Sequence, residues 1–177
     1  MNRSAILIFS CLIAALALSG CDRYLNTPQC GEKSSAEAFP NNMVMDDKGS
    51  VLDTDTGLRW YRCSAGMRFA NGQCIGDAIK LSQQDATEYA KEFSARANQD
   101  WRLPTAGEMQ TITLSGCLNP ILHPQIFPGV LIDNYWTSSI NTGMPSLGCT
   151  YYTFNGNFIC RELRSQPRPF LLVLDKP

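Results

Sequence analysis

The stretch that decides the fold of this chain is Trp101-Arg102-Leu103-Pro104-Thr105-Ala106-Gly107-Glu108-Met109. Pro104 keeps Leu103 extended, because the proline ring disfavours the helical conformation in the residue before it. Thr105 and Glu108 have the T-x-x-E spacing of a capping box, in which each side chain accepts a hydrogen bond from the backbone of the other residue. We therefore predict that a strand ends here and that a helix runs from about 106 to 114, stopping at Ser115-Gly116.

Toward the N-terminus, the sequence predicts a second helix and several short strands. Between Ser82 and Asn98, small and aromatic residues recur at helical spacing, with Ser82 as the N-cap. The tyrosine and phenylalanine of this helix are interpreted as core contacts. Residues 43–63 alternate short apolar runs with tight turns, which favours strands. The acids in these turns lack the spacing of a calcium-binding loop, so we interpret them as turn formers.

Toward the C-terminus, an irregular loop over 117–130 precedes more strand-like segments. Asn155-Gly156 is a strong signal for a two-residue hairpin loop. Residues 170–174 form an unbroken apolar run, which predicts a fully buried terminal strand. Together these elements indicate an α+β fold in which two helices are inserted in a mainly antiparallel sheet.

The first residues are typical of an exported protein. One cation, Arg3, precedes an apolar run from Ala5 to Leu18, and small residues follow. The run is too short to cross a bilayer as a helix. Leu18-Ser19-Gly20-Cys21 resembles the bacterial lipobox, which implies that Cys21 carries the lipid. We therefore expect a signal peptide over 1–20, a polar lipidated tether over 21–42 and a domain over 43–177, held at the inner or outer bacterial membrane with the domain in the periplasm or at the cell surface.

Six cysteines remain for the exported domain, which suggests three disulfides. Cys63 and Cys74 flank a short glycine-containing loop and are predicted to pair. The two-residue hairpin would set Cys149 and Cys160 diagonally, with α-carbons about 7–8 Å apart, at or past the limit for a disulfide. We therefore expect each of them to pair with Cys30 or Cys117.

Composition restricts the possible functions. The chain has 177 residues, of which 44% are hydrophobic and 18% charged, as in ordinary globular proteins. Lysine and arginine total 15 against 16 acids, so no nucleic-acid partner is predicted. No C-x-x-C pair exists and His123 is the one histidine, so we expect neither a metal site nor a cofactor.

Several motifs in a fixed order resemble a known family. They are Asp53 with Thr56-Gly57-Leu58-Arg59-Trp60, then Cys74-Ile75-Gly76, the helix after Ser82, Trp101-Arg102-Leu103-Pro104-Thr105 with Glu108, Asn119-Pro120, Phe127-Pro128 and Tyr135-Trp136-Thr137-Ser138-Ser139. In this order they resemble the Lcl C-terminal domain, found in the Legionella collagen-like adhesin and formerly a domain of unknown function. The resemblance covers roughly residues 43–175, and we interpret the motif residues as structural.

The resemblance implies a fold and a binding role. The Arg-Leu-Pro-Thr-x-x-Glu segment is also similar to the formylglycine-generating-enzyme superfamily, which implies a C-type-lectin-like architecture. In the collagen-like adhesin the domain is associated with trimers and with sulfated glycosaminoglycans. This chain has no Gly-X-Y tract and no basic excess, and its last strand lacks the arginines usual in the family, so the sulfate site is not carried over.

Three functional classes follow. A glycan-binding module needs clustered cations, and the candidates are Arg161, Arg164 and Arg168 near the C-terminus and Arg59, Arg62 and Arg68 near the first cysteine loop. A structural or protein-interaction lipoprotein of the envelope is the alternative, and a row of exposed aromatics among Tyr151, Tyr152, Phe154 and Phe158 would indicate a binding platform. An enzyme is disfavoured, because the chain lacks the common nucleophile, metalloprotease and phosphate-loop motifs.

Overall fold

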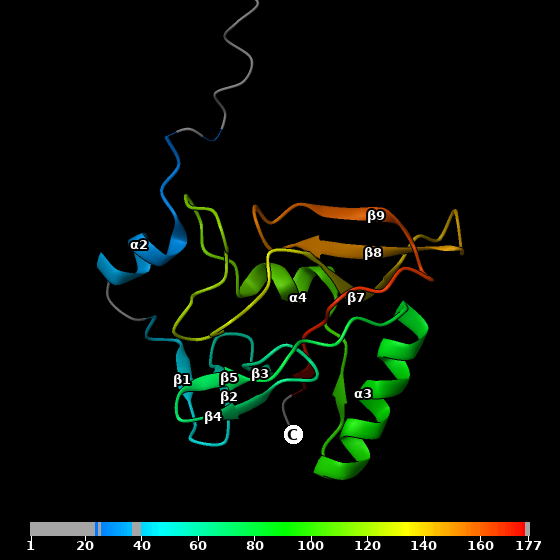
Figure 1. Ribbon diagram of the computed structural model, residues 1–177, viewed down its shortest axis with the longest axis horizontal. Coiled ribbons are helices and arrows are strands. Elements are labelled where there is room, and N and C mark those ends of the chain that lie inside the picture. Colours follow the sequence, from blue (N-terminus) through cyan, green and yellow to red (C-terminus); the bar gives the residue numbers. More distant parts are fainter. Residues whose placement is uncertain (1–23, 25, 37–39, 176–177) are drawn as a thin grey trace, which may run out of the picture.

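The computed structural model describes residues 24, 26–36 and 40–175 (Figure 1). The predicted signal peptide and Cys21 lie outside these residues. In chain order the elements are α2 (Cys30–Ala36), β1 (Met43–Met45), β2 (Ser50–Asp53), β3 (Arg59–Tyr61), β4 (Arg68–Ala70), β5 (Gln73–Ile75), α3 (Gln83–Ala97), β6 (Trp101–Arg102), α4 (Ala106–Thr111), β7 (Asn134–Ile140), β8 (Leu147–Tyr152), β9 (Phe158–Leu163) and β10 (Val173–Leu174). Within the described part, no helix has the length and apolar character needed to cross a membrane.

The strands form three antiparallel sheets. A five-stranded sheet has the order β1-β2-β3-β10-β6, a three-stranded sheet has the order β7-β8-β9, and β4 pairs with β5. Helix α3 runs beside β6 at one side of the molecule, and the three-stranded sheet lies at the opposite end from the β1–β2 turn (Figure 1). The predicted mixed fold with mainly antiparallel strands is confirmed, and α2 is a helix that the sequence did not predict.

The terminal segment 170–174 lies between two hydrophobic cores. Leu171 and Val173 belong to the core that contains Trp60, whereas the alternate residues Phe170, Leu172 and Leu174 belong to the core beneath α3. The alternation is the two-residue period of extended backbone. Burial of this segment confirms the prediction, although only Val173 and Leu174 are paired as a strand.

Both predicted helices are present with their predicted N-caps. The Ser82 side chain accepts a hydrogen bond from the backbone N–H of Asp85 at the start of α3. Thr105 and Glu108 form the complete capping box of α4. Helix α4 ends at Thr111, three residues before the predicted end, because Thr113 and Leu114 turn back to pair with the loop at Ile121 and Leu122.

The predicted Cys63–Cys74 disulfide is confirmed, but the prediction for the other four cysteines is wrong. Cys149 is bonded to Cys160, with α-carbons 3.9 Å apart. The chain turns through residues 153–157 rather than through a two-residue loop, so Tyr151 lies opposite Phe158 and not opposite Cys160. An irregularity in the register between Gly148 and Thr150 follows. The longer turn moves Cys160 two positions along, directly across from Cys149.

The third disulfide joins Cys30 to Cys117. It fastens the start of α2 to the long loop, where the backbone N–H of Cys30 also donates to the carbonyl of Leu118 at 2.7 Å. Cys30 is fully buried. Within the expected tether over 21–42, residues 26–36 therefore include a helix that is covalently tied to the domain.

Candidate functional site

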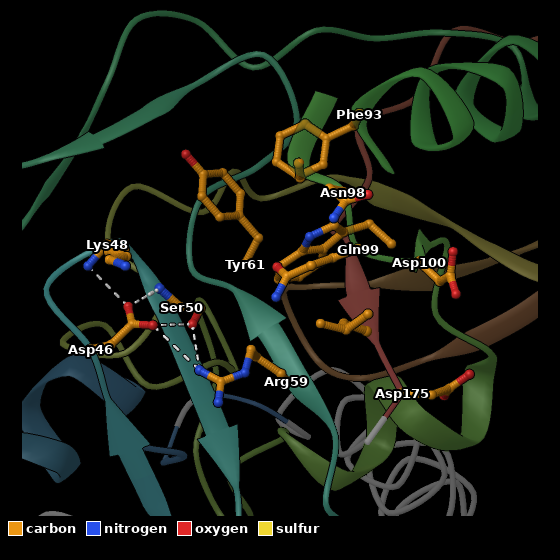
Figure 2. Close-up of a pocket in the computed structure, with 13 residues that line it drawn as sticks. Asp46, Lys48, Ser50, Arg59, Tyr61, Phe93, Asn98, Gln99, Asp100 and Asp175 are labelled. Atoms are coloured by element: carbon orange, nitrogen blue, oxygen red, sulfur yellow. Dashed lines mark hydrogen bonds and ion pairs between the residues drawn. The ribbon is translucent and has the colours of Figure 1, made fainter. Parts of the chain in front are cut away.

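A cleft with a volume of about 880 Å³ opens between the β1–β2 turn, β3 and the C-terminal end of α3 (Figure 2). This size lies within the range of small-ligand sites. Its lining residues are Asp46, Lys48, Ser50, Arg59, Tyr61, Phe93, Ala97, Asn98, Gln99, Asp100, Trp101, Leu174 and Asp175. The lining combines apolar and polar side chains.

Three aromatic rings form the apolar wall of the cleft. The ring centroids of Tyr61 and Phe93 are 5.6 Å apart, those of Phe93 and Trp101 are 5.8 Å apart, and those of Tyr61 and Trp101 are 6.3 Å apart. The Tyr61 hydroxyl accepts a hydrogen bond from the Phe69 N–H at 3.2 Å. This bond and the mutual ring contacts hold the wall in one conformation.

Trp101 is the most deeply placed of the three rings. Its side chain is 7% exposed, and its indole N–H is buried without a hydrogen-bond partner among the described residues. Buried polar groups are normally paired, and an unpaired one is costly. The indole N–H of Trp101 is therefore a buried donor that the described residues do not use.

The turn from α3 into β6 supplies the amide and carboxylate groups. Asn98 caps α3 in the left-handed conformation, with φ 51° and ψ 43°, and its backbone N–H donates to the Ser94 carbonyl. The Ser94 hydroxyl in turn donates to the carbonyl of Trp101 at 2.6 Å. The turn thereby exposes Gln99 and Asp100 at the cleft mouth.

The opposite side of the cleft is an ordered polar turn. Asp46 accepts hydrogen bonds from the backbone of Ser50 at 2.7 Å and Lys48 at 3.0 Å, and Arg59 lies 3.3 Å from its second oxygen. Burial disfavours the carboxylate, but these bonds and the Arg59 charge outweigh it, so the pKa of Asp46 is lowered. Gly49 has φ +91°, and an added Cβ would lie 2.4 Å from the Cβ of Phe69, so the turn requires glycine.

Arg102 and Glu108 form an ion pair next to the cleft residues Trp101 and Asp175. Arg102 donates to both carboxylate oxygens of Glu108, at 2.9 and 2.7 Å, and also pairs with Asp175. The hydrogen bond with Glu108 is the main cause of the raised pKa of Arg102. The hydrogen bond from Arg102 likewise lowers the pKa of Glu108, against the effect of burial. The Arg102-to-Glu108 motif thus fixes β6, α4 and the chain end together.

The other motif residues lie in the scaffold. Asp53 closes the β2–β3 turn, because its carboxylate accepts from Asp55 and Thr56 and its carbonyl accepts from Gly57. Leu58, Trp60, Leu103, Pro104, Tyr135 and Trp136 are buried or half-buried, and the Ser138 N–H donates to the Pro104 carbonyl at 2.8 Å. The Tyr135 hydroxyl lies 2.7 Å from Ser64 Oγ, and burial raises the pKa of Tyr135 to about 12.

Only one of the candidate arginines lines the cleft. Arg59 does so, whereas Arg62 is 6% exposed and donates to the carbonyls of Ile126 and Gln125. Arg168 is paired with Asp133 and Glu162. Arg161 is exposed on β9 and Arg164 donates to the Pro145 carbonyl. The candidate arginines therefore do not form one cationic surface.

The predicted hairpin aromatics do not form an exposed row either. Tyr151 is buried against Tyr135, its neighbour on β7, and its hydroxyl bonds to that of Thr113 at 2.8 Å. Phe154 packs against both Tyr152 and Tyr24. Of the four, Phe158 alone is exposed, on the edge strand.

Sequence reasoning missed most of the cleft. The sequence pattern identifies Phe93 only as a core residue, and Asp46 and Lys48 only as turn residues. The segment Asn98-Gln99-Asp100 carried a usable signal, since a polar tripeptide follows a helix and precedes a tryptophan. Within the described residues, no group of three or more potential ligands is placed to hold a metal ion. His123 is buried, and that burial lowers its pKa.

Comparison with known proteins adds one finding. The family model of the Lcl C-terminal domain matches residues 49–173, well over half of the chain. No curated protein and no solved structure matches the chain. The matched range includes every residue that lines the cleft except Asp46, Lys48, Leu174 and Asp175.

Proposed function

Because this chain belongs to the Lcl C-terminal domain family, we propose that it is a lipid-anchored bacterial binding protein whose domain recognises a saccharide in the aromatic cleft. The observation that carries the proposal is the combination of three contacting rings with amide, carboxylate and guanidinium groups around one cleft. The domain is adhesin-like, and we assign it a non-catalytic role and a C-type-lectin-like architecture.

The chemistry of the cleft suits a sugar. The C–H faces of a pyranose ring are apolar and pack on aromatic rings, while the hydroxyls around its edge need donors and acceptors. Tyr61 and Phe93 supply rings, and Asn98 and Gln99 supply amides that both donate and accept. Figure 2 shows these side chains around one opening.

The position of the cleft fits a domain held at a membrane by its N-terminus. Residues 26–29 lie at the opposite end of the molecule from the C-terminal end of α3 (Figure 1), and residues at that end of α3 line the cleft. If Cys21 carries the lipid, the end of α3 that lines the cleft lies far from the attachment end of the described domain, as an adhesive or capturing domain requires.

Two observations on the described residues favour binding over catalysis in the cleft. All six described cysteines are in disulfides, so none supplies a thiolate. The Asp46 carboxylate has a lowered pKa and is held by Arg59, which makes it a poor general base at neutral pH. These observations support binding rather than turnover.

An interaction with an envelope protein is the second candidate function. The edge strand β9 exposes Phe158, Ile159 and Leu163, and Ile140 at the end of β7 and Met144 in the β7–β8 loop of the same sheet are also exposed. Clustered exposed apolar side chains often mark protein contacts. Crosslinking in intact cells, followed by identification of peptides joined to β9, tests this candidate.

Two experiments test the main proposal. A panel of immobilised saccharides should retain the full chain in detergent, and the double variant Asn98→Gly, Gln99→Ala should lose at least about tenfold in affinity, as two lost hydrogen bonds predict. Glycine keeps the left-handed conformation at 98. The control is Gln166→Ala, at a glutamine that is also exposed but does not line the cleft. Equal loss in both variants, or no retention, would contradict the proposal.

The second experiment concerns the anchor. Cys21→Ser should move the protein from the membrane fraction to the soluble fraction, since the acyl chains are the proposed attachment. A variant at another exported cysteine pair, Cys63→Ala with Cys74→Ala, should remain in the membrane fraction. Unchanged fractionation of Cys21→Ser would remove the lipid anchor from the account.

A further inference from the structure

The charges around the cleft distinguish classes of saccharide. Among the described lining residues, three are acidic, Asp46, Asp100 and Asp175, and two are basic, Lys48 and Arg59. Figure 2 shows Asp46, Lys48 and Arg59 on one side of the opening and Asp100 and Asp175 on the other. The formal balance of these described side chains is one negative charge.

The cations are only partly available to a ligand. Arg59 uses one terminal nitrogen for Asp46, at 3.3 Å, and for the Ser50 hydroxyl, at 3.0 Å. Lys48 is exposed and has no carboxylate partner among the described residues, so it is a single unpaired ammonium. Sulfated sugars are held by several cations that act together, usually arginines in a bidentate geometry. The cleft does not provide such a set.

The acids oppose a sulfate more directly. Asp100 is exposed at the mouth and has no hydrogen-bond or ion-pair partner in the described structure. Asp175 shares Arg102 with Glu108, so one guanidinium serves two carboxylates. An anionic ligand would therefore meet uncompensated negative charge on this side. Carboxylates do accept hydrogen bonds from sugar hydroxyls, however, and do so strongly because they are charged.

From these contacts we infer that the cleft takes an uncharged saccharide and rejects sulfated ones, an inference that rests on the proposed function of the same cleft. The aromatic wall takes the apolar face of the sugar. Asp100 and the amides of Asn98 and Gln99 accept and donate hydrogen bonds at its edge. The Trp101 ring, which contacts Tyr61 and Phe93, completes the apolar wall.

The test compares three classes of probe on the full chain in detergent. They are uncharged oligosaccharides derived from cellulose and from chitin, a heparin oligosaccharide, and a fully deacetylated, cationic chitin oligosaccharide. The uncharged probes should bind best, and their affinity should change by less than about twofold between about 50 and about 500 mM salt, because screening acts on charge pairs.

A charge reversal makes the test specific to the cleft. Asp100→Lys changes the formal balance of the lining from one negative to one positive charge, and heparin binding at low salt should then rise on the order of fivefold. Asp77→Lys is the matched control, since Asp77 is also exposed but does not line the cleft. An equal rise in both variants would overturn the inference.

The outcomes separate this inference from the function it rests on. If heparin or the cationic probe binds the unmodified protein best and Arg59→Gln or Asp100→Asn abolishes that binding, the saccharide function stands and the uncharged class is wrong. If none of the three classes of probe binds, both the inference and the proposed function fail. Binding of the uncharged probes that Gln99→Ala weakens and Gln166→Ala does not supports both.

Discussion

Removal of the Cys30–Cys117 disulfide should destabilise the domain more than removal of the Cys63–Cys74 disulfide. The first bond joins residues 87 positions apart and the second joins residues 11 apart. A crosslink stabilises mainly by restricting the unfolded chain, and the loop-length relation gives about 4.6 kcal/mol for the long loop and about 2.8 kcal/mol for the short one. The expected difference in unfolding free energy is therefore about 2 kcal/mol.

The comparison uses two double variants, Cys30→Ala with Cys117→Ala and Cys63→Ala with Cys74→Ala. Urea unfolding followed by tryptophan fluorescence gives the free energy and its dependence on denaturant. The long-loop variant should also show a steeper denaturant dependence, because its unfolded chain exposes more surface. Alanine avoids placing a hydroxyl at the buried position of Cys30.

The opposite order of stabilities would refute this reasoning. If the Cys30–Cys117 pair contributes no more than the Cys63–Cys74 pair, the segment 26–36 is not fixed to the folded domain in the way described. The same result would make a truncated protein beginning at residue 43 equivalent to the whole, whereas the structure predicts that this truncation leaves Cys117 without its partner.

Three further substitutions test the scaffold around the cleft. Glu108→Gln should lower the free energy of unfolding by about 1–2 kcal/mol at neutral pH. Because Arg102 lowers the pKa of Glu108, this difference from the wild type should persist above the ordinary carboxyl pKa of 4.5 and disappear as the pH falls below the pKa of the folded protein. A constant difference in denaturation curves from pH 7 down to about pH 3 would contradict this expectation. Tyr135→Phe should cost about 1–3 kcal/mol in urea unfolding, because it removes a buried hydroxyl bonded to Ser64; an unchanged midpoint would argue against that bond. Gly49→Ala should lower the melting temperature, because residue 49 has a positive φ and an added Cβ would clash with Phe69. A melting temperature equal to that of the wild type would contradict this geometry of the turn.

Local signals in the sequence predicted much of the scaffold. The N-cap of α3 and the capping box of α4 are set by residues three positions apart, so their chemistry can be read without knowledge of the fold. The Cys63–Cys74 pair closes a loop of about a dozen residues and is local in the same sense. Residues 170–174 are all apolar, so the sequence alone predicts that the whole segment is buried.

The features that sequence reasoning missed depend on contacts between distant segments. The Asn155-Gly156 pair signals a two-residue loop, but the Thr153 N–H donates to the carbonyl of Asp133 and the Thr153 hydroxyl donates to the carbonyl of Leu131, both in the segment before β7, which draws Thr153 into the turn. The register then shifts and brings Cys149 opposite Cys160. The docking of Cys30 depends likewise on Leu118, far along the chain.

The cleft is also a product of distant segments. Tyr61, Phe93 and Trp101 come from three elements, and no spacing in the sequence relates them. Arg59 was a candidate by its charge, but its partner Asp46 could not be identified without the antiparallel pairing of β2 and β3. Arg164 and Arg168 are close in the sequence, but Arg164 bonds to Pro145 whereas Arg168 pairs with Asp133 and Glu162.

The central claim is that the aromatic cleft is the binding site, and nuclear magnetic resonance tests it most directly. The chain lacking the signal and Cys21, labelled with nitrogen-15, is titrated with the uncharged saccharide probe that the panel retains. The account predicts shifts of the Trp101 indole N–H and of the Asn98 and Gln99 side-chain amides, with the Trp60 and Trp136 indoles unchanged. Shifts confined to β9, or no shifts at saturating probe, would contradict it.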